Sequence, residues 1–228
     1  MIVLATACAR PPLADELIER WATAADRAHA AIRKVPAARY HSLLARAGIR
    51  ALLFSHTAQN DWQLHADARG KLSAFDTTGR AGPAISVAHT RGMVACGLAT
   101  TSALGVDAET YRPRAFDAIA AWSFGPQECN AVRAGQAAAF YRIWTLREAM
   151  GKATGEGLAL ATDRRDRTGG PDEGTWQKQI DGQNWLLAHY RKNGISLAVA
   201  VLLKDSEPDT SAMRWVDLES LGDAGTNT

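Results

Sequence analysis

The sequence has 228 residues, of which 46% are hydrophobic and 22% are charged, a composition typical of a folded globular protein rather than a disordered chain. Its 26 basic and 24 acidic side chains nearly balance, which excludes a surface devoted to the phosphates of nucleic acid. The sequence contains no apolar run that approaches the roughly 20 residues of a membrane-spanning helix. We therefore expect a cytoplasmic protein that binds neither nucleic acid nor a membrane.

The first half of the chain is predicted to mix strands and helices. Apolar runs bounded by turn residues indicate strands, and apolar residues at helical spacing indicate helices. In chain order the predicted elements are a strand over 2–8, a helical region over 13–31, a helix over 37–54, a turn-rich segment over 60–83, and a hairpin formed by strands over 85–88 and 93–99.

The second half is predicted to repeat this order. Gly155 follows a strong helical pattern and is expected to end the helix, and Lys192–Gly194 is the turn of a second hairpin. The predicted elements are a strand over 104–108, a partly helical segment over 111–134, a helix over 137–154, an irregular segment over 162–182, and hairpin strands over 185–190 and 195–203.

Short sequence matches between the halves suggest an internal duplication. Ala88–Arg91 resembles Ala188–Arg191, and Ala38–Tyr40 resembles Ala139–Tyr141, at separations of 100 and 101 residues. Chance similarity in an alanine-rich chain is the alternative. A duplication would make a second copy of the chain unnecessary for a complete site, so we expect a monomer.

The predicted fold is α/β (α+β), with two pseudo-symmetric halves over 1–103 and 104–228. Each half is expected to contain a small, mainly antiparallel sheet with helices packed against it.

Two carboxylates follow the apolar residues of the strand that begins the second half. Asp107 and Glu109 are two residues apart, so on a strand they face the same side. Two like charges side by side repel unless a cation neutralises them, and carboxylate oxygens suit Mg²⁺ or Mn²⁺. The alternative is a strand end that enters solvent.

A second group of polar residues lies on the helix over 137–154. Trp144, Glu148 and Lys152 are spaced by four residues and therefore form one stripe. The alternative is an exposed Glu148–Lys152 pair of little energetic value, with Trp144 in the core.

A basic stretch runs from Arg27 to Arg50 and contains no acidic residue. It is either a solvated helix face or a site for a phosphorylated ligand or an acidic partner. Its six basic residues are Arg27, Arg33, Lys34, Arg39, Arg46 and Arg50.

Taken together, these segments resemble the Sfp-type 4'-phosphopantetheinyl transferases. Gly105–Glu109 and Trp144–Lys152 are similar, in the same order, to the family's G-[IV]-D-x-E and W-x-x-K-E-A-x-x-K motifs. Gly70–Lys71 is similar to its G-K-P, Ser86–Thr90 to its N-x-S-H-S, and Phe124–Glu128 to its F-x-x-x-E. The chain departs from these patterns at Arg147, Leu72 and Ala88, where the family has Lys, Pro and Ser.

The resemblance implies transfer of phosphopantetheine from coenzyme A to a serine of an apo acyl or peptidyl carrier protein, in fatty acid, polyketide or nonribosomal peptide biosynthesis. It implies that Asp107, Glu109 and Glu148 hold Mg²⁺, with Mn²⁺ as a possible substitute. Glu148 would accept the serine proton, directly or through water. Lys152 would neutralise or protonate the leaving phosphate.

The coenzyme A contacts implied by the resemblance lie in the first half of the chain. Lys71 and His89 would contact its phosphates, and we assign Arg27 and Arg33 from the basic stretch to the same substrate. A purely structural role is the simpler interpretation of His89 when it is considered alone. Two other functions use the same residues: a metal-dependent phosphohydrolase and a non-catalytic binding module of the same fold.

Overall fold

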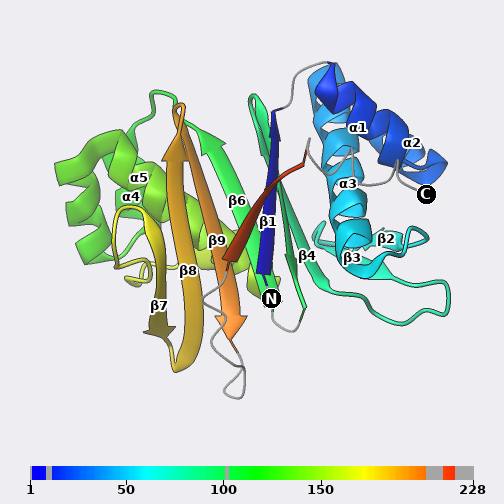
Figure 1. The fold of residues 1–228 in the computed structure, drawn as a ribbon. Coiled ribbons are helices and arrows are strands. Elements are labelled where there is room, and N and C mark those ends of the chain that lie inside the picture. The colour runs from blue at the N-terminus through cyan, green and yellow to red at the C-terminus, as the bar shows by residue number, and fades with distance from the viewer. Residues whose placement is uncertain (1, 9–11, 101–102, 204–212, 219–228) are drawn as a thin grey trace. The chain divides into compact units, whose positions relative to one another are not determined.

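The chain folds into a mixed α/β structure of small, mainly antiparallel sheets and helices (Figure 1). The computed structural model describes residues 2–8, 12–100, 103–203 and 213–218. Two compact units are present: Met1–Thr101 with Ala212–Thr228, and Ser102–Ser211. Among the described residues, no helix combines the length and the apolar character needed to span a membrane.

The first unit is built around one long helix, which packs against a four-stranded sheet of order β10-β1-β5-β4. β1 and β10 pair in parallel, and the other neighbours are antiparallel. Leu44, Leu52 and Val94 are among the fully buried residues of its core. The elements are β1 (Ile2–Cys8), α1 (Leu13–Trp21), α2 (Ala24–Ala31), α3 (Pro36–Thr57), β2 (Gln63–Ala66), β3 (Leu72–Phe75), β4 (Ala84–Thr90), β5 (Met93–Ala99) and β10 (Met213–Asp217).

The predicted first strand, the long helix and the hairpin of β4 and β5 are confirmed in this unit. The helical region over 13–31 is two helices, because Thr23 adopts an extended backbone and caps α2 through its side chain. The prediction of turns alone over 60–83 was incomplete, since β2 and β3 form a short hairpin there. The parallel pairing of β10 with β1 returns the chain to the first unit, which the sequence patterns did not anticipate.

The second unit places a long helix against an antiparallel sheet of order β6-β9-β8-β7. Its core joins Leu146 and Met150 of that helix to Trp185 and Leu187 of the sheet. The elements are β6 (Ala103–Thr110), α4 (Phe116–Ser123), α5 (Pro126–Thr154), α6 (Leu158–Ala161), β7 (Gly174–Ile180), β8 (Gln183–Lys192) and β9 (Ile195–Leu203).

The predicted helix over 137–154 is confirmed as the second part of α5. Gln136 has non-helical dihedral angles (φ 48°, ψ −130°) and separates it from the first part, and Gly155 ends it in a left-handed conformation. The hairpin of β8 and β9 is also confirmed; it turns at Asn193 and Gly194, both with positive φ. The prediction of an irregular segment over 162–182 was partly wrong, because this segment contains β7.

Gly105 allows β6 to approach α5 at backbone distance. A Cβ atom at this position would lie 1.8 Å from the carbonyl oxygen of Ala149, so any side chain would force the strand and the helix apart. Side chains two and four residues further along the strand share this face. Asp107 and Glu109 therefore lie on the face of β6 that is turned towards α5.

Candidate functional site

Asp107 lies on β6 and forms a hydrogen-bonded ion pair with Lys152 in the last turn of α5. Lys152 Nζ donates to Asp107 Oδ1 at 2.8 Å and to the carbonyl oxygen of Val106 at 2.9 Å. The other carboxylate oxygen, Oδ2, is buried and accepts no hydrogen bond within the described part of the chain. Leaving a buried charged acceptor unsatisfied is costly, so this oxygen is suited to a further cationic or hydrogen-bonding partner.

Glu148 and Glu109 share the electrostatic environment of Asp107. Burial, and then the charge of Asp107, raises the pKa of Glu148 to about 7, although Lys152 acts in the opposite direction. Burial and Asp107 also raise the pKa of Glu109, whose Oε2 lies 3.7 Å from Nη2 of Arg114. The strand and the helix thus hold three mutually repelling carboxylates near one ammonium group.

These carboxylates provide the kind of ligands that a magnesium ion requires. As the side chains are placed, no three His, Cys, Asp or Glu residues in the described ranges are close enough to share one metal ion. The donor chemistry nevertheless fits, because all the ligands are carboxylate oxygens and Asp107 Oδ2 lacks a partner. A divalent cation would also relieve the repulsion that raises the pKa of Glu148 and Glu109.

The stripe predicted on the helix is its accessible face. Within residues 140–153, only Trp144, Glu148 and Lys152 are partly exposed, and all the others are buried. The ring of Trp144 stacks on Phe140 with a centroid distance of 5.9 Å. Within the described residues, Lys152 pairs with Asp107 and not with Glu148. The alternative of an exposed Glu148–Lys152 pair is therefore wrong.

The residues assigned to coenzyme A in the first unit lie on separate elements. The backbone N–H of Lys71 donates to Asp67 Oδ1 at 2.9 Å, and burial lowers the pKa of its ammonium group. His89 is exposed at the end of β4, and its ring lies 5.7 Å from that of His41.

Arg27 and Arg33 are both exposed; Arg27 lies in the first half of α2, and Arg33 follows the end of that helix. Arg27 Nη2 lies 3.8 Å from Glu19 Oε1, and the carbonyl oxygen of Arg33 accepts from Arg39 Nη2 at 3.1 Å. Neither side chain lines the cavity described next, which the same basic stretch helps to form.

The basic stretch contains two buried arginines that sequence reasoning placed on a solvated face or at a ligand. Arg46 Nη1 and Arg50 Nε contact the buried carboxylate of Asp26 at 3.1 and 2.6 Å. Asp26 directly precedes the stretch, so the sequence contained an acidic partner for these arginines next to the basic residues. Both arginines, together with His29 and Trp62, line a cavity of 690 Å³.

Arg46 has an unsatisfied guanidinium edge at this cavity. Its side chain is 8% exposed, and its one hydrogen bond among the described residues is that of Nη1 to Asp26. Nε and Nη2 are thus available to an anion in the cavity. Arg46 is therefore a candidate binding residue; sequence reasoning named it within the basic stretch but assigned only Arg27 and Arg33 to the substrate.

The raised pKa of Glu148 predicts how stability depends on pH and magnesium. A carboxyl with a raised pKa stabilises the fold below its unfolded value, and this contribution is lost as pH rises through about 7. We expect the Tm of metal-free protein to fall between pH 5.5 and 8, relative to Glu148→Gln, and Mg²⁺ to restore it at pH 8. Differential scanning calorimetry measures both effects. Equal pH dependence in the two proteins, with no response to Mg²⁺, would contradict this assignment.

The second unit, which contains these carboxylates, is similar in sequence to known proteins. Residues 103–200 match the family described as the 4'-phosphopantetheinyl transferase superfamily. The chain is also 29% identical over 118 residues to the 4'-phosphopantetheinyl transferase HetI of Nostoc sp. (strain PCC 7120 / SAG 25.82 / UTEX 2576). That alignment covers 49% of this chain and 50% of HetI, so the similarity extends over about half of each protein. Asp107, Glu109, Glu148 and Lys152 all lie within the family match.

Proposed function

Because residues 103–200 match the 4'-phosphopantetheinyl transferase superfamily, we propose that this chain transfers phosphopantetheine from coenzyme A to a serine of an apo acyl or peptidyl carrier protein. The observation that carries the proposal is the convergence of β6 and α5. They bring three carboxylates and one lysine together, with Lys152 Nζ 2.8 Å from Asp107 Oδ1. This arrangement offers carboxylate oxygens as ligands for a cation and a charged donor for phosphate chemistry.

Transfer forms a bond between the serine oxygen and the phosphorus of the phosphopantetheine group. It breaks the bond from that phosphorus to the oxygen that leaves with adenosine 3',5'-bisphosphate. Asp107, Glu109 and Glu148 would hold Mg²⁺, which when bound neutralises charge on the pyrophosphate oxygens. Glu148 accepts the serine proton, directly or through water.

Lys152 is the residue placed to act on the leaving group. Its side chain is 33% exposed, and Asp107 and the carbonyl of Val106 hold Nζ in place with two hydrogen bonds. An ammonium group has three N–H donors, so one remains for a phosphate oxygen. Lys152 neutralises the charge that develops as the phosphorus–oxygen bond breaks.

Coenzyme A binding is proposed for Lys71, His89, Arg27 and Arg33 in the first unit. Replacing Lys71 or His89 by alanine should raise the KM for coenzyme A about tenfold to a hundredfold, because a hydrogen bond to a charged group contributes about 1.5–3 kcal/mol. The KM for the carrier protein should change less. Steady-state kinetics with each substrate varied in turn measures both constants.

Arg80 offers a matched control for Lys71. Its backbone N–H donates to Asp76 Oδ1 at 2.9 Å, just as that of Lys71 donates to Asp67, and its side chain is 80% exposed. Arg80→Ala should leave the KM for coenzyme A unchanged. If Lys71→Ala and His89→Ala behave like this control, both residues have structural roles only.

The decisive experiment is incubation of the protein with coenzyme A, Mg²⁺ and apo carrier proteins of fatty acid, polyketide and nonribosomal peptide synthases. Mass spectrometry should show the gain of one phosphopantetheine group on at least one carrier. Phosphate released from coenzyme A without a carrier protein would instead identify a phosphohydrolase. Coenzyme A binding without either product would identify a non-catalytic binding module.

The pseudo-symmetry of the two halves, a monomeric state and a cytoplasmic location belong to the same proposal. In support of a duplication, each unit has one long helix, α3 or α5, packed against antiparallel strands. A duplicated unit can supply a complete site from one chain, and the cytoplasm contains the proposed substrates.

A further inference from the structure

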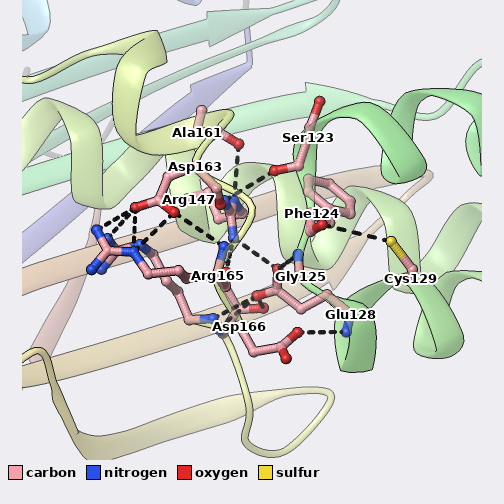
Figure 2. A network of polar contacts seen from close by, with 12 residues as sticks. Ser123, Phe124, Gly125, Glu128, Cys129, Arg147, Ala161, Asp163, Arg165 and Asp166 are labelled. Atoms are coloured by element: carbon pink, nitrogen blue, oxygen red, sulfur yellow. Dashed lines mark hydrogen bonds and ion pairs between the residues drawn. The ribbon is translucent and has the colours of Figure 1, made fainter.

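Arg147 is completely buried beside the proposed site, and all five of its N–H groups donate hydrogen bonds (Figure 2). Nη1 donates to the carboxylate of Glu128 at 2.7 Å. The other acceptors are the carbonyl oxygens of Ala161 (2.9 Å), Arg165 (2.9 Å), Ser123 (3.1 Å) and Asp163. The ring of Phe124 covers the guanidinium group at 5.3 Å. The guanidinium group therefore has no donor left for a substrate.

Glu128 is equally committed to the protein. Its Oε1 accepts from the backbone N–H groups of Arg167 (3.0 Å) and Thr168 (2.8 Å) and from the hydroxyl of Thr168 (2.8 Å). Its Oε2 accepts from Arg147 and, at 3.4 Å, from the backbone N–H of Gly125. The two oxygens of this carboxylate thus accept five hydrogen bonds inside the protein and leave no free edge directed at a substrate.

The Arg147–Glu128 pair joins four parts of the second unit. It connects the end of α4, the first turn of α5, the middle of α5 and the segment 161–168 (Figure 2). Residues adjacent in a helix project about 100° apart around its axis. Fixing Arg147 therefore fixes the rotation of α5, and with it the direction in which Glu148 projects.

A lysine cannot replace Arg147 in this network. An ammonium group has three N–H donors on a single nitrogen. The acceptors here surround a planar guanidinium group and receive hydrogen bonds from its three separate nitrogen atoms. With lysine, at least two of the five acceptors would lose their partner inside the protein. Each such loss loosens the segment 161–168 or the helix itself.

We propose that Arg147 and Glu128 are positioning residues that hold α5 in the rotation that keeps Glu148 within the electrostatic reach of Asp107, and that arginine rather than lysine is required at position 147. The catalytic part of this inference rests on the proposed transferase function. The positioning of α5 does not rest on it, because this part of the inference concerns only how the three carboxylates are presented to a cation.

The test compares Arg147→Lys with Arg142→Lys. Arg142 is also buried in α5 and donates to the carbonyl oxygens of Thr168, Gly170 and Pro171, so its replacement loosens the adjoining loop without breaking the Arg147 network. Well below the Tm of each variant, we expect Arg147→Lys to lower kcat for carrier loading at least tenfold, with the KM for coenzyme A within about twofold. Arg142→Lys should keep kcat within about twofold, whatever its loss of Tm.

A second readout is independent of activity. Mg²⁺ should raise the Tm of the wild type and of Arg142→Lys at pH 8, and the concentration giving half of this effect should increase at least fivefold in Arg147→Lys. If the wild type responds to Mg²⁺ but loads no carrier, the transferase proposal fails while this comparison still decides the inference.

Three results would overturn the inference. The first is unchanged Mg²⁺ dependence in Arg147→Lys, and the second is an equal loss of kcat in both arginine variants. If Arg147→Lys does not fold, Glu128→Gln undergoes the same measurements, because it keeps the shape of the side chain and removes its charge. The third result is that neither variant folds, which would leave the Arg147–Glu128 pair a structural role only.

Discussion

Replacing Glu148 or Asp107 by alanine is expected to lower carrier loading at least about a thousandfold, while leaving the protein folded. Each change removes a carboxylate from the proposed magnesium site, and electrostatic stabilisation of a transition state in such a site typically contributes several kcal/mol. Initial rates of phosphopantetheine transfer, measured by mass spectrometry across a range of Mg²⁺ concentrations, give the size of the loss.

The stability of the same variants provides the control. Glu148 carries a carboxyl whose charged form is disfavoured by burial and by Asp107, so Glu148→Ala should not destabilise metal-free protein at pH 8. An inactive variant with an unchanged or increased Tm has lost chemistry rather than structure. Near-normal turnover of either alanine variant at low Mg²⁺, or wild-type activity that survives a chelator, would show that the metal assignment is wrong.

Exchanging the charges of Glu148 and Lys152 is expected to inactivate the protein. In Glu148→Lys with Lys152→Glu, an ammonium group would occupy the place of a metal ligand. A carboxylate would then lie near Asp107, where Lys152 Nζ now donates at 2.8 Å. Two exposed residues one turn apart would tolerate such an exchange at a cost of about 0.5 kcal/mol. Carrier loading by the exchanged protein at a tenth of the normal rate would refute both assignments.

Lys152→Met isolates the charge of the lysine from its length. Methionine keeps most of the apolar stem but cannot donate to a phosphate or to Asp107. We expect most of kcat to be lost and the Tm to change by only a few degrees, since the side chain of Lys152 is one-third exposed. Single-turnover kinetics would separate this loss in the chemical step from slow product release.

Local patterns predicted the parts of the site that depend on local geometry. The spacing of Asp107 and Glu109 along a strand, and of Trp144, Glu148 and Lys152 along a helix, places each set on one face in the structure. The helix boundaries at Gln136 and Gly155 also follow from residues near them in the chain. The assignment of these residues to metal binding and catalysis remains a prediction.

Long-range pairing was the part that local patterns could not provide. Asp26 forms buried ion pairs with both Arg46 and Arg50, which lie 20 and 24 residues away, so two residues of a stretch that looks uniformly basic are paired inside the protein. The strand β7 escaped prediction because its residues are mostly polar, so no apolar run marked it in the sequence. β10 pairs with β1 from the other end of the chain, and no local pattern specifies such a partner.

The backbone contact at Gly105 sets how the protein tolerates change. Every other amino acid carries a Cβ, and this atom would overlap the carbonyl oxygen of Ala149 at 1.8 Å, so no single substitution at this position is neutral. In a library selected for carrier loading, Gly105 and Asp107 would therefore be equally intolerant. A parallel selection for cellular abundance would separate them, since Gly105 variants would be depleted and Asp107 variants retained. An invariant position in this chain can thus reflect how closely a strand and a helix approach, with no role in binding a substrate.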